Sequence, residues 1–387
     1  MKFYYSQYFD RLDDKIASYK VRYGWNYKRI ALKLAYWNLC FLFKKKHINS
    51  SFNDSQQHIL FEVCGGVGDL VISGSYISAF AQKFGKNTVI DILLEKAFFE
   101  SGKVIYSQIE GVNNIITETS KRYDLTINLV RYPVIKQFFP KRLQKDLVQY
   151  VEHINSFHAQ NPLVAKNDFF GRCYAQEQGR YREDEADIDN LLDMHKKEWQ
   201  LSSPKDEKIN LQKFGLRAKK YITMHTGYGK HFIGVEKETR QWPEENYSKL
   251  TQMLKKAHSE YQIVQIGETR QSKIDGTDID LRGKTTFEEM LSILKNAKLH
   301  ISQEGGMAII RHFLKGGPSV TLFGPTDESF YGFKENINIT ARCCPHPCEW
   351  LCKSWMKKCM STGNVAKCIQ LLTPDIVFKE IKENINL

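Results

Sequence analysis

Short apolar runs alternate with amphipathic stretches from residue 58 to the end of the chain. Most runs end at a glycine or a polar turn, which is typical of buried strands in a parallel sheet. They predict strands at 58–63, 88–94, 125–130, 221–225, 262–266, 299–302 and 319–323. Helical spacing of apolar residues predicts helices at 244–261, 287–297 and 307–315. It also predicts one helix that ends near residue 84 and a last helix that begins at Thr373-Pro374. Such alternation predicts an α/β fold with two Rossmann-like domains.

The stretch 299–326 predicts one strand–helix–strand unit in which Gly305 and Gly306 form the first turn. Such a turn presents backbone N–H groups and a helix N-terminus at the carboxyl end of a strand, where α/β sheets bind anions. Because Gly305 and Gly306 have no side chains, a ligand can come close to the backbone N–H groups of residues 305, 306 and Met307. Because Glu304 would repel a phosphate, we expect it to bind a hydroxyl or amine of the ligand. A tight turn in an ordinary α/β core explains the same glycines and stays open.

A second glycine turn, Cys64-Gly65-Gly66-Val67-Gly68-Asp69, follows the strand at 58–63. Asp69 lies at the start of a helix, where its carboxylate can cap backbone N–H groups. The same carboxylate stands at the ligand-binding edge of the sheet, where it can serve as a general base. The sequence leaves both roles open.

Composition divides the chain into four predicted segments. Residues 1–57 form a basic, aromatic helical extension, and residues 58–205 form the first Rossmann-like domain. Residues 206–341 form the second, and residues 342–387 form a cysteine-rich segment with the last helix. The boundary between the two domains is placed at a polar linker, Ser202-Ser203-Pro204-Lys205.

Positive charge is concentrated at the start of the chain. The net charge is +12, and residues 1–57 hold eleven Lys/Arg against four Asp/Glu. This excess favours an anionic surface: membrane headgroups, a phosphorylated acceptor or nucleic acid. The apolar run 29–43 is shorter than the ~20 residues that span a bilayer, so it predicts a helix that lies on anionic lipid, or one that packs on the protein or on another subunit. No signal peptide is recognisable, and scattered single cysteines indicate the reducing cytoplasm.

Four short motifs occur in order between residues 58 and 385. They are Gly68-Asp69, Arg240-Gln241-Trp242-Pro243, Asp280-Leu281-Arg282-Gly283-Lys284-Thr285, and the unit that ends in Leu322-Phe323-Gly324-Pro325-Thr326. Each motif alone is weak, but the ordered set resembles glycosyltransferase family 9, the heptosyltransferases. The resemblance implies the GT-B fold, with two Rossmann-like domains that face a cleft, the first for the acceptor and the second for a nucleotide sugar. It also implies that the last helix returns to the first domain.

The resemblance implies inverting, metal-independent transfer of heptose from ADP-heptose to a lipopolysaccharide-core or other anionic cell-surface glycan or glycolipid. The enzyme would then work in the cytoplasm, at the inner face of the bacterial inner membrane. Asp69 would be the base, while Arg240 and the N–H groups at 305–307 would neutralise the departing diphosphate. Gly68 would border the donor, and Glu268, after a predicted strand, would bind the ribose. No Asp-x-Asp sequence lies in either glycine turn to hold Mg²⁺.

The chain departs from the family pattern at two places. Ile309 stands where family members often have His, so a hydrogen bond to the donor is lost or comes from elsewhere, with His312 as one candidate. Arg240 replaces the usual Lys, which keeps the charge and can grip two phosphate oxygens. The first departure leaves the donor sugar open and is compatible with a catalytically weak member.

Six of the nine cysteines lie between Cys343 and Cys368. Their spacing differs from the Cys-x₂-Cys pairs of a zinc ribbon, but four thiolates together in a cytoplasmic protein favour zinc or iron. We predict that at least four of five cysteines bind one ion: Cys344, Cys348, Cys352, Cys359 and Cys368. Resemblance to bacterial autotransporter heptosyltransferases, which carry an iron site on C-terminal cysteines, favours iron. Reduced, packed thiols and disulfides stay open.

Two other functions use the same features. Transfer to a protein, as in the autotransporter heptosyltransferases, is favoured within the sequence only by the cysteine cluster. A nucleic-acid-binding metalloprotein would use the basic aromatic N-terminus and the cysteines. Neither α/β domain has a basic-aromatic pattern, so we expect no nucleic-acid partner.

Overall fold

The computed structural model describes residues 50–51, 55–129, 133–160, 192, 199–227, 238–341, 343, 348, 356–359, 361–363 and 366–385. The predicted helix at 29–43 lies outside these residues. Contacts divide the chain into two compact units. The first unit comprises residues 1–64, 77–99 and 109–193, and the second comprises residues 65–76, 100–108 and 194–387. The four segment boundaries drawn from composition stay predictions.

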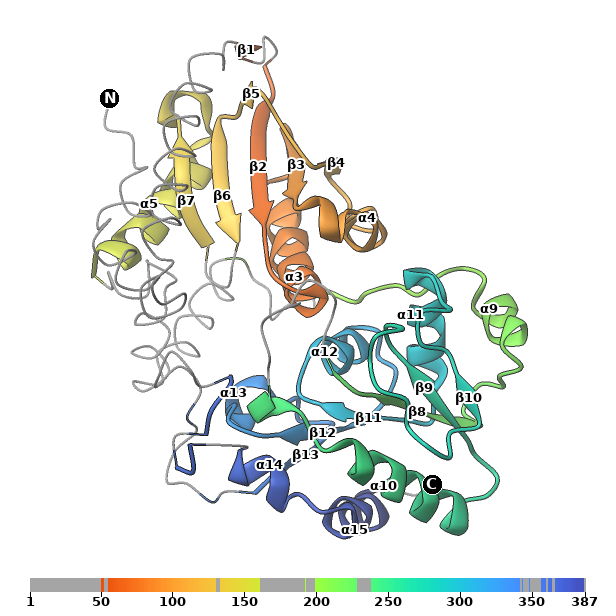
Figure 1. Ribbon diagram of the computed structural model, residues 1–387. Coiled ribbons are helices and arrows are strands. Elements are labelled where there is room, and N and C mark those ends of the chain that lie inside the picture. Colours follow the sequence, from red (N-terminus) through yellow and green to blue (C-terminus); the bar gives the residue numbers. More distant parts are fainter. Residues whose placement is uncertain are drawn as a thin grey trace, which may run out of the picture. The chain divides into compact units, whose positions relative to one another are not determined.

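The first unit contains a five-stranded sheet in the order β4-β3-β2-β6-β7 (Figure 1). Its strands are β2 (Gln57–Val63), β3 (Thr88–Leu94), β4 (Val112–Ile116), β6 (Leu125–Leu129) and β7 (Pro133–Phe138). Strands β2, β3, β4 and β6 are parallel to one another, whereas β7 pairs antiparallel with β6. The strands predicted at 58–63, 88–94 and 125–130 are confirmed. A small sheet pairs β1 (Ser50–Ser51) with β5 (Lys121–Arg122).

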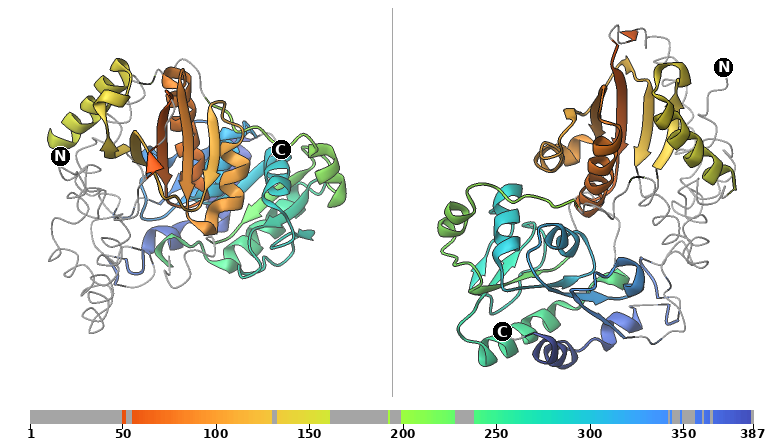
Figure 2. Two further views of the ribbon diagram at one scale, coloured as in Figure 1. Left: turned by 90° about the horizontal axis from the view of Figure 1, so that it is seen from above. Right: turned by 180° about the vertical axis from the view of Figure 1, so that it is seen from behind.

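Helices α3 (Val67–Phe84) and α5 (Lys145–Gln160) cover one face of this sheet. Figure 2 shows the ribbon of this sheet and its helices from two further directions. The ring of Phe80 on α3 meets Phe61 of β2 edge to face, with centroids 5.0 Å apart, and also contacts Tyr150 of α5 at 5.9 Å. These rings bury the apolar side of β2. Helix α4 (Phe99–Tyr106) follows the short 3-10 turn η4 (Lys96–Phe98), and a second such turn, η5 (Pro140–Arg142), precedes α5.

The second unit contains a six-stranded parallel sheet in the order β10-β9-β8-β11-β12-β13. Its strands are β8 (Tyr221–His225), β9 (Gln262–Ile266), β10 (Ile279–Asp280), β11 (Leu299–Gln303), β12 (Ser319–Phe323) and β13 (Ile337–Thr340). The four strands predicted at 221–225, 262–266, 299–302 and 319–323 are present, whereas β10 and β13 were not predicted. Two separate, mostly parallel sheets confirm the predicted α/β class with two Rossmann-like domains.

Four helices of the second unit begin within one residue of the predicted positions: α10 (Glu244–Ala257), α11 (Phe287–Asn296), α12 (Gly306–Phe313) and α15 (Pro374–Asn384). The unit also contains helices that were not predicted, α9 (Glu207–Lys213), α13 (Glu328–Tyr331) and α14 (Lys367–Leu371), and the 3-10 turn η8 (Glu238–Arg240) before α10. At α11, Thr286 and Glu289 form a reciprocal capping box. In the described part of the chain, no helix is long and apolar enough to cross a bilayer.

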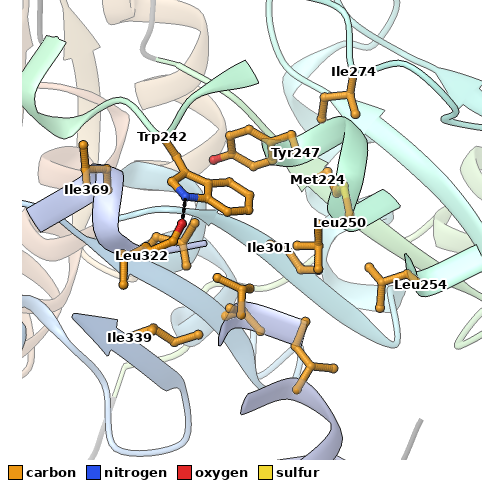
Figure 3. Packing of buried hydrophobic residues seen from close by; sticks show 14 of the residues in the cluster. Met224, Trp242, Tyr247, Leu250, Leu254, Ile274, Ile301, Leu322, Ile339 and Ile369 are labelled. Atoms are coloured by element: carbon orange, nitrogen blue, oxygen red, sulfur yellow. Dashed lines mark hydrogen bonds between the residues drawn. The ribbon is translucent and has the colours of Figure 1, made fainter. Parts of the chain in front are cut away.

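The last helix belongs to the second unit, so the prediction that it returns to the first domain is wrong. Val377 and Ile381 of α15 are fully buried in an apolar cluster with Leu250 of α10 and Leu322 of β12. Figure 3 labels Leu250 and Leu322 in this cluster. Burial of each such side chain contributes roughly 1.5–3 kcal/mol, and this gain holds α15 against α10.

Candidate functional site

The glycine turn after β11 is held by bonds to its neighbours. The backbone N–H of Glu304 donates to the carbonyl of Leu322 on β12 at 2.9 Å. The hydroxyl of Tyr247 on α10 donates to Gln303 Oε1 at 2.6 Å. Glu304 itself is only 7% exposed. The turn therefore has a fixed position at the carboxyl end of the sheet, as predicted for residues 304–306.

The Arg240-Gln241-Trp242-Pro243 motif is anchored by its tryptophan. Trp242 is fully buried, its indole N–H donates to the carbonyl of Leu372 at 2.5 Å, and its ring meets Tyr247 at 4.7 Å and 79° (Figure 3). The carbonyl of Thr239 approaches Gly324 so closely that a Cβ added there would lie 2.8 Å from it. Glycine at 324 therefore lets the segment before Trp242 pack beside the end of β12.

This anchoring brings Arg240 to the glycine turn. Its Nη2 donates to the carboxylate of Glu304 in an ion pair, and to the backbone carbonyl of Glu304 at 3.2 Å. The two side chains are 12% and 9% exposed. The structure thus joins two predicted site residues that are 64 positions apart in the sequence. In this state the carboxylate compensates the charge of the guanidinium, so an anionic ligand of Arg240 must compete with Glu304.

Asp69 lies in the first turn of α3, on the part of that helix that belongs to the second unit. Its Oδ2 accepts a hydrogen bond from the N–H of Gly66 at 2.7 Å, and the residue is exposed. A carboxylate at this position bonds back to the N-cap, so the capping role is confirmed. Exposure leaves the carboxylate accessible to a substrate, and its role as base stays a prediction.

Gly68 and Gly306 pack backbone against backbone within the second unit. A Cβ added to Gly68 would lie 2.9 Å from Gly306 Cα and 2.9 Å from Ile309 Cδ1. These glycines are therefore required for close packing, besides any ligand that approaches the turn. Ile309, at the place of the family histidine, offers only an apolar contact here.

His312, the candidate to supply the missing hydrogen bond, is engaged by other side chains, and its role toward the donor stays a prediction. Its Nδ1 is paired with the carboxylate of Glu335, and its ring stacks on Phe333 with centroids 3.7 Å apart. His312 lies six residues beyond Gly306 on α12, which is about 9 Å along the helix axis. Its side chain is thus engaged away from the glycine turn.

The turn after β9 holds Glu268 at the same edge of the sheet. The N–H of Glu268 donates to Gln271 Oε1 at 3.2 Å, and Arg270 Nε donates to Glu268 Oε2 at 3.2 Å. Gly267 has φ +137, and a Cβ there would overlap Gln271 Oε1. Glu268 is therefore oriented by a rigid turn while its carboxylate remains partly exposed, as a ribose partner requires.

Gln271 also fixes His225 at the end of β8. Gln271 Nε2 lies 3.2 Å from His225 Nε2 and can donate to it, because Gln271 Oε1 already accepts from Glu268. Burial lowers the pKa of His225 to about 4, against the opposing charge of Glu268. The imidazole is therefore neutral near pH 7. Sequence reasoning did not single out either residue, although the position of His225 at a strand end was visible.

The structure describes four cysteines of the C-terminal cluster: Cys343, Cys348, Cys359 and Cys368. No disulfide joins Cys64, Cys343, Cys348, Cys359 and Cys368, while Cys344 and Cys352 of the predicted metal set lie outside the described residues. Burial raises the pKa of Cys368 to about 12, with the neighbouring thiols of Cys343, Cys348 and Cys359 adding to the rise.

Cys359 has the opposite shift. Burial opposes its ionisation, but hydrogen bonds from Lys367, Thr362 and Ser361 outweigh burial and lower its pKa to about 7. Thiolates with such bonds are suited to metals. Among the residues that the structure describes, no three His, Cys, Asp or Glu side chains are grouped to hold an ion. The predicted metal site therefore stays a prediction.

Comparison with known proteins adds a family and a fold. Residues 185–360 match the model of glycosyltransferase family 9 (heptosyltransferase). No curated protein sequence matches the chain. A glycosyl transferase family 9 structure from Veillonella parvula DSM 2008 is 14% identical, with a TM-score of 0.51 over 84% of this chain and 96% of that chain.

TibC gives a second structural match. This iron-containing dodecameric glycosyltransferase from enterotoxigenic E. coli H10407 is 13% identical, with a TM-score of 0.52 over 85% of this chain and 76% of TibC. A structure of TibC with ADP-D-β-D-heptose matches with a TM-score of 0.53, 13% identity, and 85% and 77% coverage. At such identities the structures show the fold alone. The chain therefore carries a glycosyltransferase family 9 (heptosyltransferase) domain in residues 185–360 and is a glycosyltransferase with the GT-B fold.

Proposed function

We propose that the protein transfers heptose from ADP-heptose to a hydroxyl of a lipopolysaccharide core or another anionic cell-surface glycan or glycolipid. The observation that carries this proposal is the contact of Arg240 with Glu304 at the turn between β11 and α12. A cation, an acid and a helix N-terminus meet there at the carboxyl edge of a parallel sheet. That combination suits a sugar diphosphate, which presents both anionic oxygens and hydroxyls.

The reaction needs a base on the acceptor and cations on the leaving group. Asp69 accepts the proton of the attacking hydroxyl as the new glycosidic bond forms at the anomeric carbon. The bond from that carbon to the diphosphate breaks, and ADP leaves with the electron pair. Arg240 and the N–H groups at 305–307 stabilise the charge that develops on ADP. Attack from the face opposite to the leaving group inverts the configuration, without a metal in the transfer step.

Donor binding changes the partners of Arg240 in this proposal. The diphosphate oxygens replace the Glu304 carboxylate at the guanidinium, which can hold two of them. Glu304 then accepts a hydrogen bond from a hydroxyl of the sugar, which is the role expected of it from sequence. Glu268, held by Gln271, accepts from the ribose hydroxyls. Gly68 borders the donor through its packing on Gly306.

A panel of nucleotide sugars tests the donor. ADP-heptose should raise the melting temperature of the full-length protein, because a ligand that binds the folded state stabilises it. UDP-glucose and GDP-mannose, which differ from ADP-heptose in both the nucleotide base and the sugar, serve as negative controls. Product formation with an extracted core oligosaccharide then tests transfer. No stabilisation by ADP-heptose would reject the proposed donor.

A protein acceptor and a C-terminal iron site form a second candidate. It is favoured by the thiols of Cys343, Cys348 and Cys359, which lie near enough to Cys368 to add to the rise in the pKa of that residue. A metal held by at least four of Cys344, Cys348, Cys352, Cys359 and Cys368 would supply structural cross-links to the C-terminal segment. Elemental analysis of protein purified without an affinity tag should find about one iron or zinc per chain. Metal-free, folded protein would reject this site and leave the glycan acceptor in place.

A contact with the inner face of the membrane is proposed from the charge of residues 1–57. Deletion of residues 1–50 should weaken binding to vesicles that contain phosphatidylglycerol, and salt should weaken binding of the whole chain. Equal binding by both forms would assign the N-terminal segment to protein packing instead.

A further inference from the structure

A cluster of polar side chains, none of which has a role in the proposal above, lies at the carboxyl end of the first sheet. Glu62 on β2, Asn128 on β6 and Lys136 on β7 form it. Lys136 Nζ is ion-paired with Glu62, and Asn128 Nδ2 donates to Glu62 Oε2 at 3.4 Å. The side chains of Lys136 and Glu62 are 30% and 25% exposed, so a ligand can reach them.

The sheet places these three groups on one face. Glu62 and Asn128 are register partners on parallel strands, so their side chains point to the same side. Phe61 points to the other side, where its ring meets Phe80 of α3. The three strands lie side by side in Figure 1. Glu62 and Asn128 therefore lie on the face of the sheet opposite to the one on which α3 packs.

A bulge turns Lys136 toward this face. In the pairing of β6 with β7, Thr126 faces Gln137 and Ile127 faces Ile135, so Lys136 is an extra residue on β7. Such bulges re-aim side chains and recur next to functional sites. Here the bulge lets the lysine reach past β6 to Glu62 on β2.

The amide of Asn128 has an unused acceptor. Asn128 is 6% exposed, and its Oδ1 is buried with no hydrogen-bond partner among the described residues. Its Nδ2 lies against Glu62, so the amide group is directed into the cluster. A buried carbonyl oxygen without a donor is costly, which favours a bound molecule that supplies one.

The charges of the cluster select the kind of molecule. Lys136 is already balanced by Glu62 in their ion pair, so these two side chains carry no net charge together. An anion would have to displace Glu62 from Lys136 and would be repelled by the Glu62 carboxylate. A hydroxyl both donates and accepts, so adjacent hydroxyls can bond to a carboxylate, an amide and an ammonium group together.

We propose that Glu62, Asn128 and Lys136 form a subsite for an uncharged, polyhydroxyl sugar residue of the acceptor. Charged groups of the same glycan then lie outside this subsite. The assignment of the ligand as an acceptor rests on the proposed function, whereas the subsite itself does not. The competing explanation is an ion pair that only ties β7 to the rest of the sheet.

Saturation-transfer NMR on the full-length protein separates these explanations, with methyl α-D-mannopyranoside as the neutral probe and methyl glucuronide as the acidic one. The wild type should bind the neutral probe and not the acidic one. Glu62→Gln keeps the shape of the side chain, and Lys136→Met keeps much of its length. Each should weaken binding of the neutral probe by about tenfold, as expected for loss of a charged hydrogen-bond partner. Lys141→Met, the same change at an exposed lysine of this unit, is the control.

Unchanged binding in Glu62→Gln and Lys136→Met, or tighter binding of the acidic probe, would overturn the subsite. A purely structural ion pair would lower the melting temperature of the variants without changing the affinity of the folded protein for the neutral probe. Stabilisation by ADP-heptose, measured on the same samples, reports on the second unit. Its absence in the wild type would reject the proposed donor, while loss of sugar binding alone would still support the subsite.

Discussion

Replacing Glu304 by Gln tests whether the acid opposes or supports the binding of ADP. The substitution keeps the size of the side chain and an oxygen that accepts from Arg240, and it removes the negative charge. Because the pair is 12% and 9% exposed, its charges interact with little screening by water. We expect Glu304→Gln to bind ADP more tightly than the wild type.

Coulomb's law sets the magnitude. A carboxylate about 5–6 Å from a phosphate charge raises the free energy of the complex by about 3 kcal/mol at an effective dielectric constant of 20. That energy corresponds to roughly 100-fold in affinity. Solvent that enters an open site reduces the effect, so we expect a ten- to hundredfold gain. Without ADP the variant should be less stable by about 1–3 kcal/mol, since Arg240 loses the charge that compensates it.

Calorimetric titration with ADP and thermal unfolding with and without ADP measure both effects. The exposed Glu245 on α10 provides a matched control, because Glu245→Gln makes the same change of charge in the same unit. Weaker ADP binding by Glu304→Gln, with unchanged stability of the unliganded protein, would refute the reasoning. Glu304 would then orient Arg240 for the diphosphate instead of competing with it.

Three other changes have definite expected outcomes. Asp69→Asn keeps an oxygen that can cap α3 and should lower turnover by about 10²–10⁴ while ADP binding is retained, and full activity would exclude Asp69 as the base. Arg311 is fully buried and donates to the carbonyls of Leu294, Ala297, Gly317 and Pro318, so Arg311→Met should lower the unfolding free energy by about 3–5 kcal/mol in urea titrations. Burial lowers the pKa of His225 to about 4 and that of His300 far below its usual value, so the unfolded chain binds more protons between about pH 6.5 and 4. Stability should therefore fall as the pH drops through this window, by roughly 1.4 kcal/mol per pH unit for each histidine, and His225→Asn should reduce the slope.

The sequence predicted seven strands of the two large sheets because buried parallel strands are continuous apolar runs that end at turns. The runs at 58–63, 221–225 and 319–323 have no polar face to obscure them, and each lies within a residue of the observed strand. It did not predict β7, whose Pro133–Phe138 mixes polar and apolar residues because it is an antiparallel strand at the sheet edge. Nor did it place α15, since an apolar stripe on a helix does not indicate which sheet it will cover.

The sequence also identified residues of the candidate site, but it did not show which of them are in contact. Motif order pointed to Asp69, Arg240, Glu268 and Glu304, because strand ends in a parallel sheet meet at one edge. Only the tertiary structure paired Arg240 with Glu304, since that contact depends on the burial of Trp242 and the register of β11. The same holds for Lys136 and Glu62, which are 74 residues apart and meet through a bulge. Local pattern determines secondary structure, whereas such contacts depend on side-chain packing among segments distant in the chain, which no local pattern records.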